Sequence, residues 1–162
     1  MSWSYLWSRR TSGFAGKLPK ESYVGLHFET DGSPDLWIVN RALIPFEAKP
    51  TFPWHLSIII NMKDVIEMGL PTREEQHVLG ELGEEMGGKL KANGNALILA
   101  SGTWKGVRQL LFRVRDPEVA NRYLSVVVAN PSAVRPMEYR MEQDPLWAKA
   151  EQYLAAARRA EK

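Results

Sequence analysis

The 162-residue sequence contains no cysteine. This absence excludes disulfide bonds, thiolate metal sites and cysteine nucleophiles. Histidine is also scarce, because the protein has only His27, His55 and His77. No two of them stand three or four residues apart, the spacing that places two imidazoles on one helix face in zinc sites. The sequence therefore predicts no metal and no other cofactor.

The sequence also lacks long apolar runs and a strong excess of one charge. No stretch approaches the roughly 20 apolar residues that a membrane-spanning helix needs. The first twenty residues lack the continuous apolar segment of a signal peptide. We therefore expect a cytoplasmic protein without membrane contacts. The net charge of +2 is too small to indicate a nucleic-acid partner for the whole protein.

The first 20 residues combine basic and aromatic side chains without any acid: Arg9, Arg10, Lys17 and Lys20 with Trp3, Tyr5, Trp7 and Phe14. Such an arm can bind nucleic acid nonspecifically or lie on a membrane surface. The alternative, which we favour, is a first strand with Trp3, Tyr5 and Trp7 on one face. We expect residues 1–20 to be this arm or strand, and residues 21–162 to form one domain with its core from about residue 54.

An amphipathic helix is the clearest element of the sequence. Thr72 and Glu75 form a capping-box pattern, in which the Thr72 hydroxyl accepts from the Glu75 amide and the Glu75 carboxylate reaches back to the amide of Thr72. Gly94 ends the pattern. One apolar stripe runs along the helix: Val78, Leu79, Leu82, Met86 and Leu90.

Apolar and alternating segments on both sides of this helix predict strands. Residues 54–62 are apolar on both faces, which indicates a strand inside a sheet. Residues 96–101 and 107–114 read as a hairpin joined through 102–106, and residues 137–142 alternate as an edge strand behind Pro136. Asp116-Pro117 and Asp144-Pro145 begin two further helices.

The order of these elements predicts an α+β fold. From residue 54 the order strand, helix, strand, strand, helix, strand is the split βαββαβ pattern of a ferredoxin-like core. Residues 23–28 and 36–43, joined by a turn around Asp31-Gly32, add an N-terminal β-hairpin, and the segment after Asp144 adds a C-terminal helix.

Three glycines, Gly80, Gly83 and Gly87, lie on one flank of the central helix, where each costs roughly 1 kcal/mol relative to alanine. We expect this flank to pack closely against a neighbouring helix, with the helix starting at Asp116 as the first candidate. The alternative is a bare flank that receives a ligand or the backbone of a partner.

Three short motifs lie along the chain: Gly69-Leu70-Pro71-Thr72 with Glu74-Glu75, Gly106-x-Arg108 before Phe112, and Tyr139 followed by Asp144-Pro145-x-Trp147. Together they resemble the domain-of-unknown-function family six hundred ninety-five, an uncharacterised bacterial-type α+β domain. An early Trp3 and Tyr5 also fit. The resemblance implies no activity, and a regulatory role only because some relatives are joined to a domain similar to the protein inhibitor of ribonuclease E.

Three side chains are further binding candidates. His77 lies near carboxylates on the polar side of the central helix, and Trp104 stands in the segment between two strands. Arg108 shares a face with Leu110 and Phe112 in strand alternation. It can reach an anion, but we expect it to pair with a carboxylate that locks the hairpin.

The sequence therefore favours a non-catalytic binding or regulatory module that acts through protein contacts, since no motif for acyl transfer or phosphate binding is present. One alternative is an enzyme whose site uses His77, Arg108 and nearby carboxylates. The other is nonspecific nucleic-acid binding through the N-terminal arm.

Overall fold

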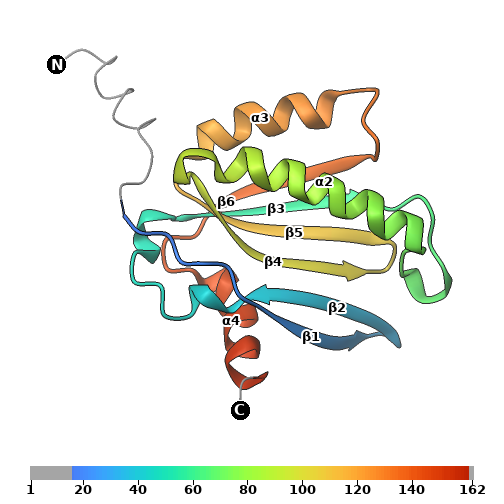
Figure 1. Cartoon of the computed structure of the whole chain (residues 1–162), viewed down its shortest axis with the longest axis horizontal. Coiled ribbons are helices and arrows are strands. Elements are labelled where there is room, and N and C mark those ends of the chain that lie inside the picture. The colour runs from blue at the N-terminus through green and yellow to red at the C-terminus, as the bar shows by residue number, and fades with distance from the viewer. Residues whose placement is uncertain (1–15, 161–162) are drawn as a thin grey trace.

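The computed structural model describes residues 16–160, which form a six-stranded antiparallel sheet and three helices (Figure 1). The strand order is β1-β2-β4-β5-β3-β6. The strands are β1 (Tyr23–Thr30), β2 (Ser33–Asn40), β3 (Trp54–Asn61), β4 (Ala96–Trp104), β5 (Val107–Val114) and β6 (Met137–Gln143). The helices are α2 (Arg73–Lys91), α3 (Pro117–Ala129) and α4 (Ala148–Ala160).

Helices cover both faces of this sheet. Helices α2 and α3 lie along one face and α4 lies on the other (Figure 1). Each face therefore has its own hydrophobic core. The first core lies between the sheet and helices α2 and α3, and its side chains come mainly from β3, β5 and these two helices. It contains Leu56, Ile58, Ile60, Leu79, Met86, Leu110, Phe112 and Leu124. The second core lies between the sheet and helix α4. It contains Trp37, Val39, Leu43, Phe52, Leu99, Leu111, Trp147 and Leu154.

The mixed helix and strand architecture predicted from the sequence is confirmed. Strand β3 lies inside the sheet between β5 and β6, as its apolar residues on both faces require. Strand β6 is an edge strand, and β1 and β2 form a hairpin beside β4. The full strand order is not that of a simple ferredoxin fold, because this hairpin extends the sheet beyond β4.

The capping box at the start of α2 is only half formed. The Thr72 hydroxyl accepts from the Glu75 amide at 3.2 Å, as predicted. The Glu75 carboxylate does not reach back to Thr72, whose amide donates to the carbonyl of Asp64 instead. The Glu75 carboxylate accepts from the Lys63 amide and forms an ion pair with Arg135. A buried cation and loop amide therefore replace the capping contact.

Two sequence predictions about local structure are wrong. Gly102 was expected in the connection between β4 and β5, but it lies inside β4, and the turn consists of Lys105 and Gly106. A Cβ at Gly102 would lie 2.4 Å from the indole of Trp37, so this glycine makes room for a core side chain. The last helix was expected to begin at Asp144-Pro145, but α4 begins at Ala148, and Leu146 before it is 91 % exposed.

The predicted first strand around Trp3, Tyr5 and Trp7 lies outside the described residues. The nucleic-acid alternative depends mainly on that segment and stays a prediction.

Candidate functional site

The helices leave part of each sheet face open. Helix α4 contacts the β1 and β2 side of its face, and a polar pocket lies beside it over β5, β3 and β6. On the opposite face, α2 and α3 leave β2 and the end of β4 open, and a second, more apolar groove lies there. These two hollows are the candidate sites.

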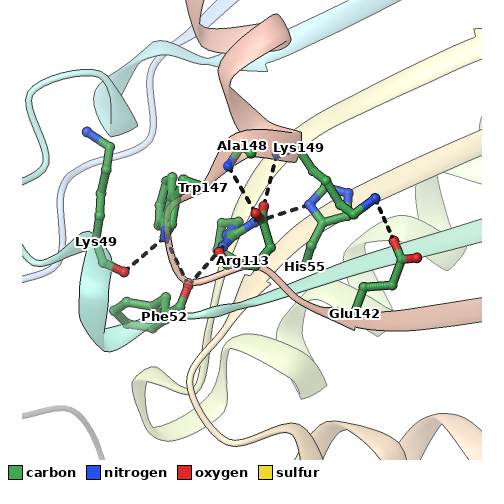
Figure 2. A network of polar contacts seen from close by, with 9 residues as sticks. Lys49, Phe52, His55, Arg113, Glu142, Trp147, Ala148 and Lys149 are labelled. Atoms are coloured by element: carbon green, nitrogen blue, oxygen red, sulfur yellow. Dashed lines mark hydrogen bonds and ion pairs between the residues drawn. The ribbon is translucent and has the colours of Figure 1, made fainter.

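The polar pocket has a volume of about 630 Å³. Ser57 and Gln109 lie on its floor, and the Gln109 amide donates to the Ser57 hydroxyl at 2.8 Å. The Gln109 carbonyl accepts from the indole N–H of Trp104 at 3.1 Å. Lys149 of α4 pairs with Glu142 of β6 at 3.0 Å across the rim (Figure 2).

A buried arginine cluster lies beside this pocket and shares His55, Ala148 and Lys149 with its lining (Figure 2). Arg113 is fully buried, and its Nη1 donates to the Asp144 carboxylate at 2.8 Å. Its Nη2 donates to the carbonyls of Phe52 and Asp144. The guanidinium carbon lies 4.6 Å from the centre of the Trp147 ring, a cation–π contact. The arginine thus fixes α4 and the loop before β3 to the sheet.

Asp144 connects this cluster to the start of α4. Its carboxylate accepts from the amides of Ala148 and Lys149, both at 3.0 Å, and so caps the helix. Burial opposes ionisation of Asp144, but hydrogen bonds from Arg113 and these two amides outweigh it and hold its pKa below the ordinary value. Asp144 therefore does not start the helix as the sequence predicted, but its carboxylate accepts from the first two amides of α4 and is also the counter-charge of a buried arginine.

His55 is held as a neutral imidazole with a fixed tautomer. Its Nδ1 lies 3.3 Å from Nη1 of Arg113. Since a guanidinium can only donate, Nδ1 must accept and the proton must sit on Nε2. Burial, and then the nearby Arg113 charge, lower the pKa of His55 to about 4. This histidine can donate a hydrogen bond into the pocket, but it has no free ring nitrogen to act as a general base.

The apolar groove on the other face, which we call the Arg108 groove, has a volume of about 540 Å³. Strand β2, the ends of β4 and β5, the loop before α2 and the first turn of α2 form its walls. It is lined by Leu36, Trp37, Ile38, Ile66, Leu70, Pro71, Thr72, Arg73, Gln76, Ser101, Thr103 and Arg108. Three of its apolar side chains are solvent-exposed, namely Leu36 (40 %), Ile38 (47 %) and Ile66 (55 %).

Arg108 lies at the floor of this groove and is only 8 % exposed. Its Nε donates to the Thr103 hydroxyl at 3.0 Å, and its Nη2 donates to the Gln76 side-chain carbonyl at 2.6 Å. Among residues 16–160 no carboxylate lies within salt-bridge distance of Arg108. The expectation that a carboxylate pairs with this arginine is therefore wrong. Burial lowers the pKa of Arg108, and neutral partners do nothing to restore it.

The glycine flank of α2 is open at Gly80 and Gly83, whereas Gly87 is buried. A Cβ at Gly80 or Gly83 would meet no atom within 4 Å, and one at Gly87 would meet only the Lys91 side chain at 3.6 Å. The predicted close packing against the helix that starts at Asp116 is therefore not found. Gln76 and Lys91 lie on the same stripe as these glycines, because successive helix residues turn by about 100°. Since Gln76 contacts Arg108 and Lys91 contacts Glu21 before β1, the flank faces the side of the β1–β2 hairpin.

The other site candidates do not converge. His77 is exposed on α2 and pairs with Glu81 at 3.1 Å. Trp104 lies on the α4 face, where it bonds to Gln109, whereas Arg108 lies on the α2 face. The structure brings Arg108 and the glycine flank to one side of the sheet. His77 and Trp104 belong to other surfaces.

Sequence reasoning missed the Arg113 cluster and the Glu75–Arg135 pair. A signal for the first was present, since Arg113 alternates with the apolar residues of a strand that is buried on both faces. The Glu75–Arg135 pair joins residues 60 positions apart in the sequence, so no local pattern predicts it.

A comparison with known families matches the part of the chain that contains most of these elements. A family model described as "Family of unknown function (DUF695)" matches residues 27–155. The chain belongs to the DUF695 family. The DUF695 match includes the loop before α2, the Arg108 strand and most of α4. Searches of curated proteins and of solved structures found no match. None of the helices that the structure describes has the length and apolar character that crossing a bilayer requires.

Proposed function

We propose that this DUF695 domain is a non-catalytic binding module that acts through protein contacts, and that its partner docks in the Arg108 groove. The main support for docking there is the exposed apolar surface of the groove. Leu36, Ile38 and Ile66 are exposed around it, whereas comparable side chains of β3 and β5 are buried under α2 and α3. Contiguous exposed apolar surface is typical of interaction sites.

The glycine flank of α2 supports this proposal. Omitting Cβ from Gly80 and Gly83 weakens the helix without any packing gain inside the domain. A helix flank without side chains lets a second backbone approach closely. A partner segment lying in the groove can therefore extend along α2 from Gln76 toward Lys91.

The chemistry of the polar pocket also favours binding over catalysis. His55 carries its proton on Nε2 because Arg113 occupies Nδ1, so Ser57 has no base beside it. His77 is exposed on α2 and pairs with Glu81, which is also exposed. Ser57 accepts a hydrogen bond from the Gln109 amide, which is not a base, and this pairing supports a binding role over nucleophilic catalysis.

We further propose that β3–β6 with α2 and α3 form a ferredoxin-like core to which the β1–β2 hairpin and α4 are added. The order β4-β5-β3-β6, antiparallel throughout, supports it. An experimental structure with β3 at an edge of the sheet would contradict this proposal.

Substitution of one groove residue tests the binding function. Ile38→Glu places a charge on the exposed wall of the groove, and Val126→Glu makes the same change at a 70 % exposed position of α3. We expect partners captured from a lysate by the full-length protein to be lost with Ile38→Glu and retained with Val126→Glu. Melting temperatures within a few degrees of the parent protein establish that both variants are folded. Equal capture by both variants would contradict docking in the groove.

A further inference from the structure

Among the described residues, Arg108 at the floor of the groove has no counter-charge, whereas the other buried arginines each have one. Three arginines among residues 16–160 are buried: Arg108, Arg113 and Arg135. Arg113 pairs with Asp144, and Arg135 pairs with Glu75. Of these three, Arg108 is the one held by neutral groups, Thr103 and Gln76. Buried charges in proteins are as a rule paired, because desolvation without compensation is expensive.

The two neutral partners hold the guanidinium in place without using up its hydrogen-bonding capacity. Thr103 and Gln76 take one N–H each. Three of the five N–H groups of Arg108 therefore remain, including both on Nη1. Among the described residues, the buried side-chain atoms that lack a hydrogen-bond partner do not include Nη1 of Arg108. Nη1 is therefore accessible to solvent in the groove. The arginine is thus held in position and largely buried, while both of its partners are neutral.

The groove surrounds this cation with apolar walls. Leu36 and Ile38 lie on one side, and Ile66, Leu70 and Pro71 on the other. A single buried guanidinium matches one singly charged planar anion, and a carboxylate accepts two parallel N–H bonds from it. Arg73, the other cation of the lining, is exposed on the first turn of α2, so the groove offers a phosphate dianion one buried guanidinium and not a cluster of buried donors.

We infer that the Arg108 groove is a carboxylate subsite, and that the partner docks with a protein segment in which a carboxylate stands beside apolar side chains. The inference rests on the proposed binding function and names the chemistry of the partner. The carboxylate supplies the counter-charge of Arg108, and the apolar side chains cover Ile38 and Ile66. An aspartate or glutamate and the C-terminus of a polypeptide offer the same group.

A pair of peptides that differ only in this charge tests the inference. The probes are N-acetyl-Leu-Leu with a free C-terminal carboxylate and the same dipeptide as its amide. Each is titrated into the ¹⁵N-labelled full-length protein, and the amide signals of Ile38 and Thr103 and the Nε–H signal of Arg108 are followed by NMR. We expect the carboxylate to bind at least about tenfold more tightly than the amide, since hydrogen bonds to charged groups are the stronger ones.

Two variants assign the difference to Arg108. In Arg108→Met the two peptides should bind equally, and in Arg108→Lys the preference for the carboxylate should be retained in part. Equal binding of the two peptides to the parent protein would overturn the inference and leave the proposed docking groove intact. Absence of any shift at Ile38, Thr103 and Arg108, or inorganic phosphate shifting the Arg108 signal as effectively as the carboxylate, would also overturn it. The proposed function fails separately, if Ile38→Glu captures the same partners as the parent protein.

Discussion

Glu75 and Arg135 form a buried ion pair between the first turn of α2 and the loop before β6. The Glu75 carboxylate also accepts from the amide of Lys63, so this single residue links three segments. The hydrogen bonds from Arg135 lower the pKa of Glu75 to about 2, against an opposing contribution from burial. At the scale of single residues, this carboxylate is the principal polar contact that anchors α2.

Replacing Glu75 by glutamine should therefore lower the free energy of unfolding by about 3–5 kcal/mol, because Arg135 would be left buried without its counter-charge. Urea unfolding at neutral pH measures the change. The matched control is Glu74→Gln, an exposed first-turn residue whose charge contributes at most about 1 kcal/mol through the helix dipole. Similar losses for the two variants would contradict the structural role of the pair.

His55 gives the protein a specific pH dependence. Its pKa is depressed from 6.5 to about 4, so the unfolded chain binds a proton between these values and the folded protein does not. Stability from neutral His55 is therefore fully present above about pH 6.5 and is lost as pH falls toward 4. The loss is on the order of 3 kcal/mol.

We expect His55→Gln, whose amide oxygen can still accept from Arg113, to reduce the fall in unfolding free energy between pH 6.5 and 4.5. Comparing urea unfolding of parent and variant at both pH values isolates the contribution of this histidine from those of the carboxylates. Parallel pH profiles would mean that His55 titrates normally in the folded protein.

Among the elements, helix α2 and strand β4 contain glycines whose surroundings differ. Gly83 on α2 has open space where a Cβ would be, whereas Gly102 in β4 lies against the Trp37 ring. The first glycine weakens its helix for no internal packing reason, and the second is required by the core.

Gly83→Ala should accordingly raise the free energy of unfolding by up to about 1 kcal/mol through helix propensity. Gly102→Ala should lower it by about 1–3 kcal/mol, because the rigid indole must move. Thermal melting of the two variants provides the comparison. A destabilised Gly83→Ala would show that the flank is packed after all, and an unaffected Gly102→Ala would contradict the tight contact with Trp37.

Local patterns in the sequence predict the elements well, for physical reasons. The caps at Thr72 and Asp116 and the Pro136 edge all form as expected, because capping and proline sterics act over a few residues. Gly102 was misread because a glycine that admits a distant ring looks the same in sequence as a glycine in a turn. The glycine flank was misassigned for a related reason, since helix periodicity gives the direction of a flank but not what lies opposite.

At the scale of the whole molecule, the candidate site depends on contacts that no local pattern encodes. Arg108 was correctly placed on the face it shares with Leu110 and Phe112. That its partners are Thr103 and Gln76 follows only once α2, β4 and β5 are assembled. The open groove likewise results from where α2 and α3 end on the sheet and where the hairpin extends it.

If Arg108 serves a ligand and not the fold, removing its charge should not destabilise the folded domain. The decisive measurement is the free energy of unfolding of Arg108→Met without any partner, with Arg113→Met as the comparison. We predict that Arg108→Met lies within about 1 kcal/mol of the parent protein or above it, since an unpaired buried charge is removed and the apolar stem is kept. Arg113→Met, which strands Asp144, should lose about 3–5 kcal/mol. A loss for Arg108→Met as large as that for Arg113→Met would show that Arg108 serves the fold.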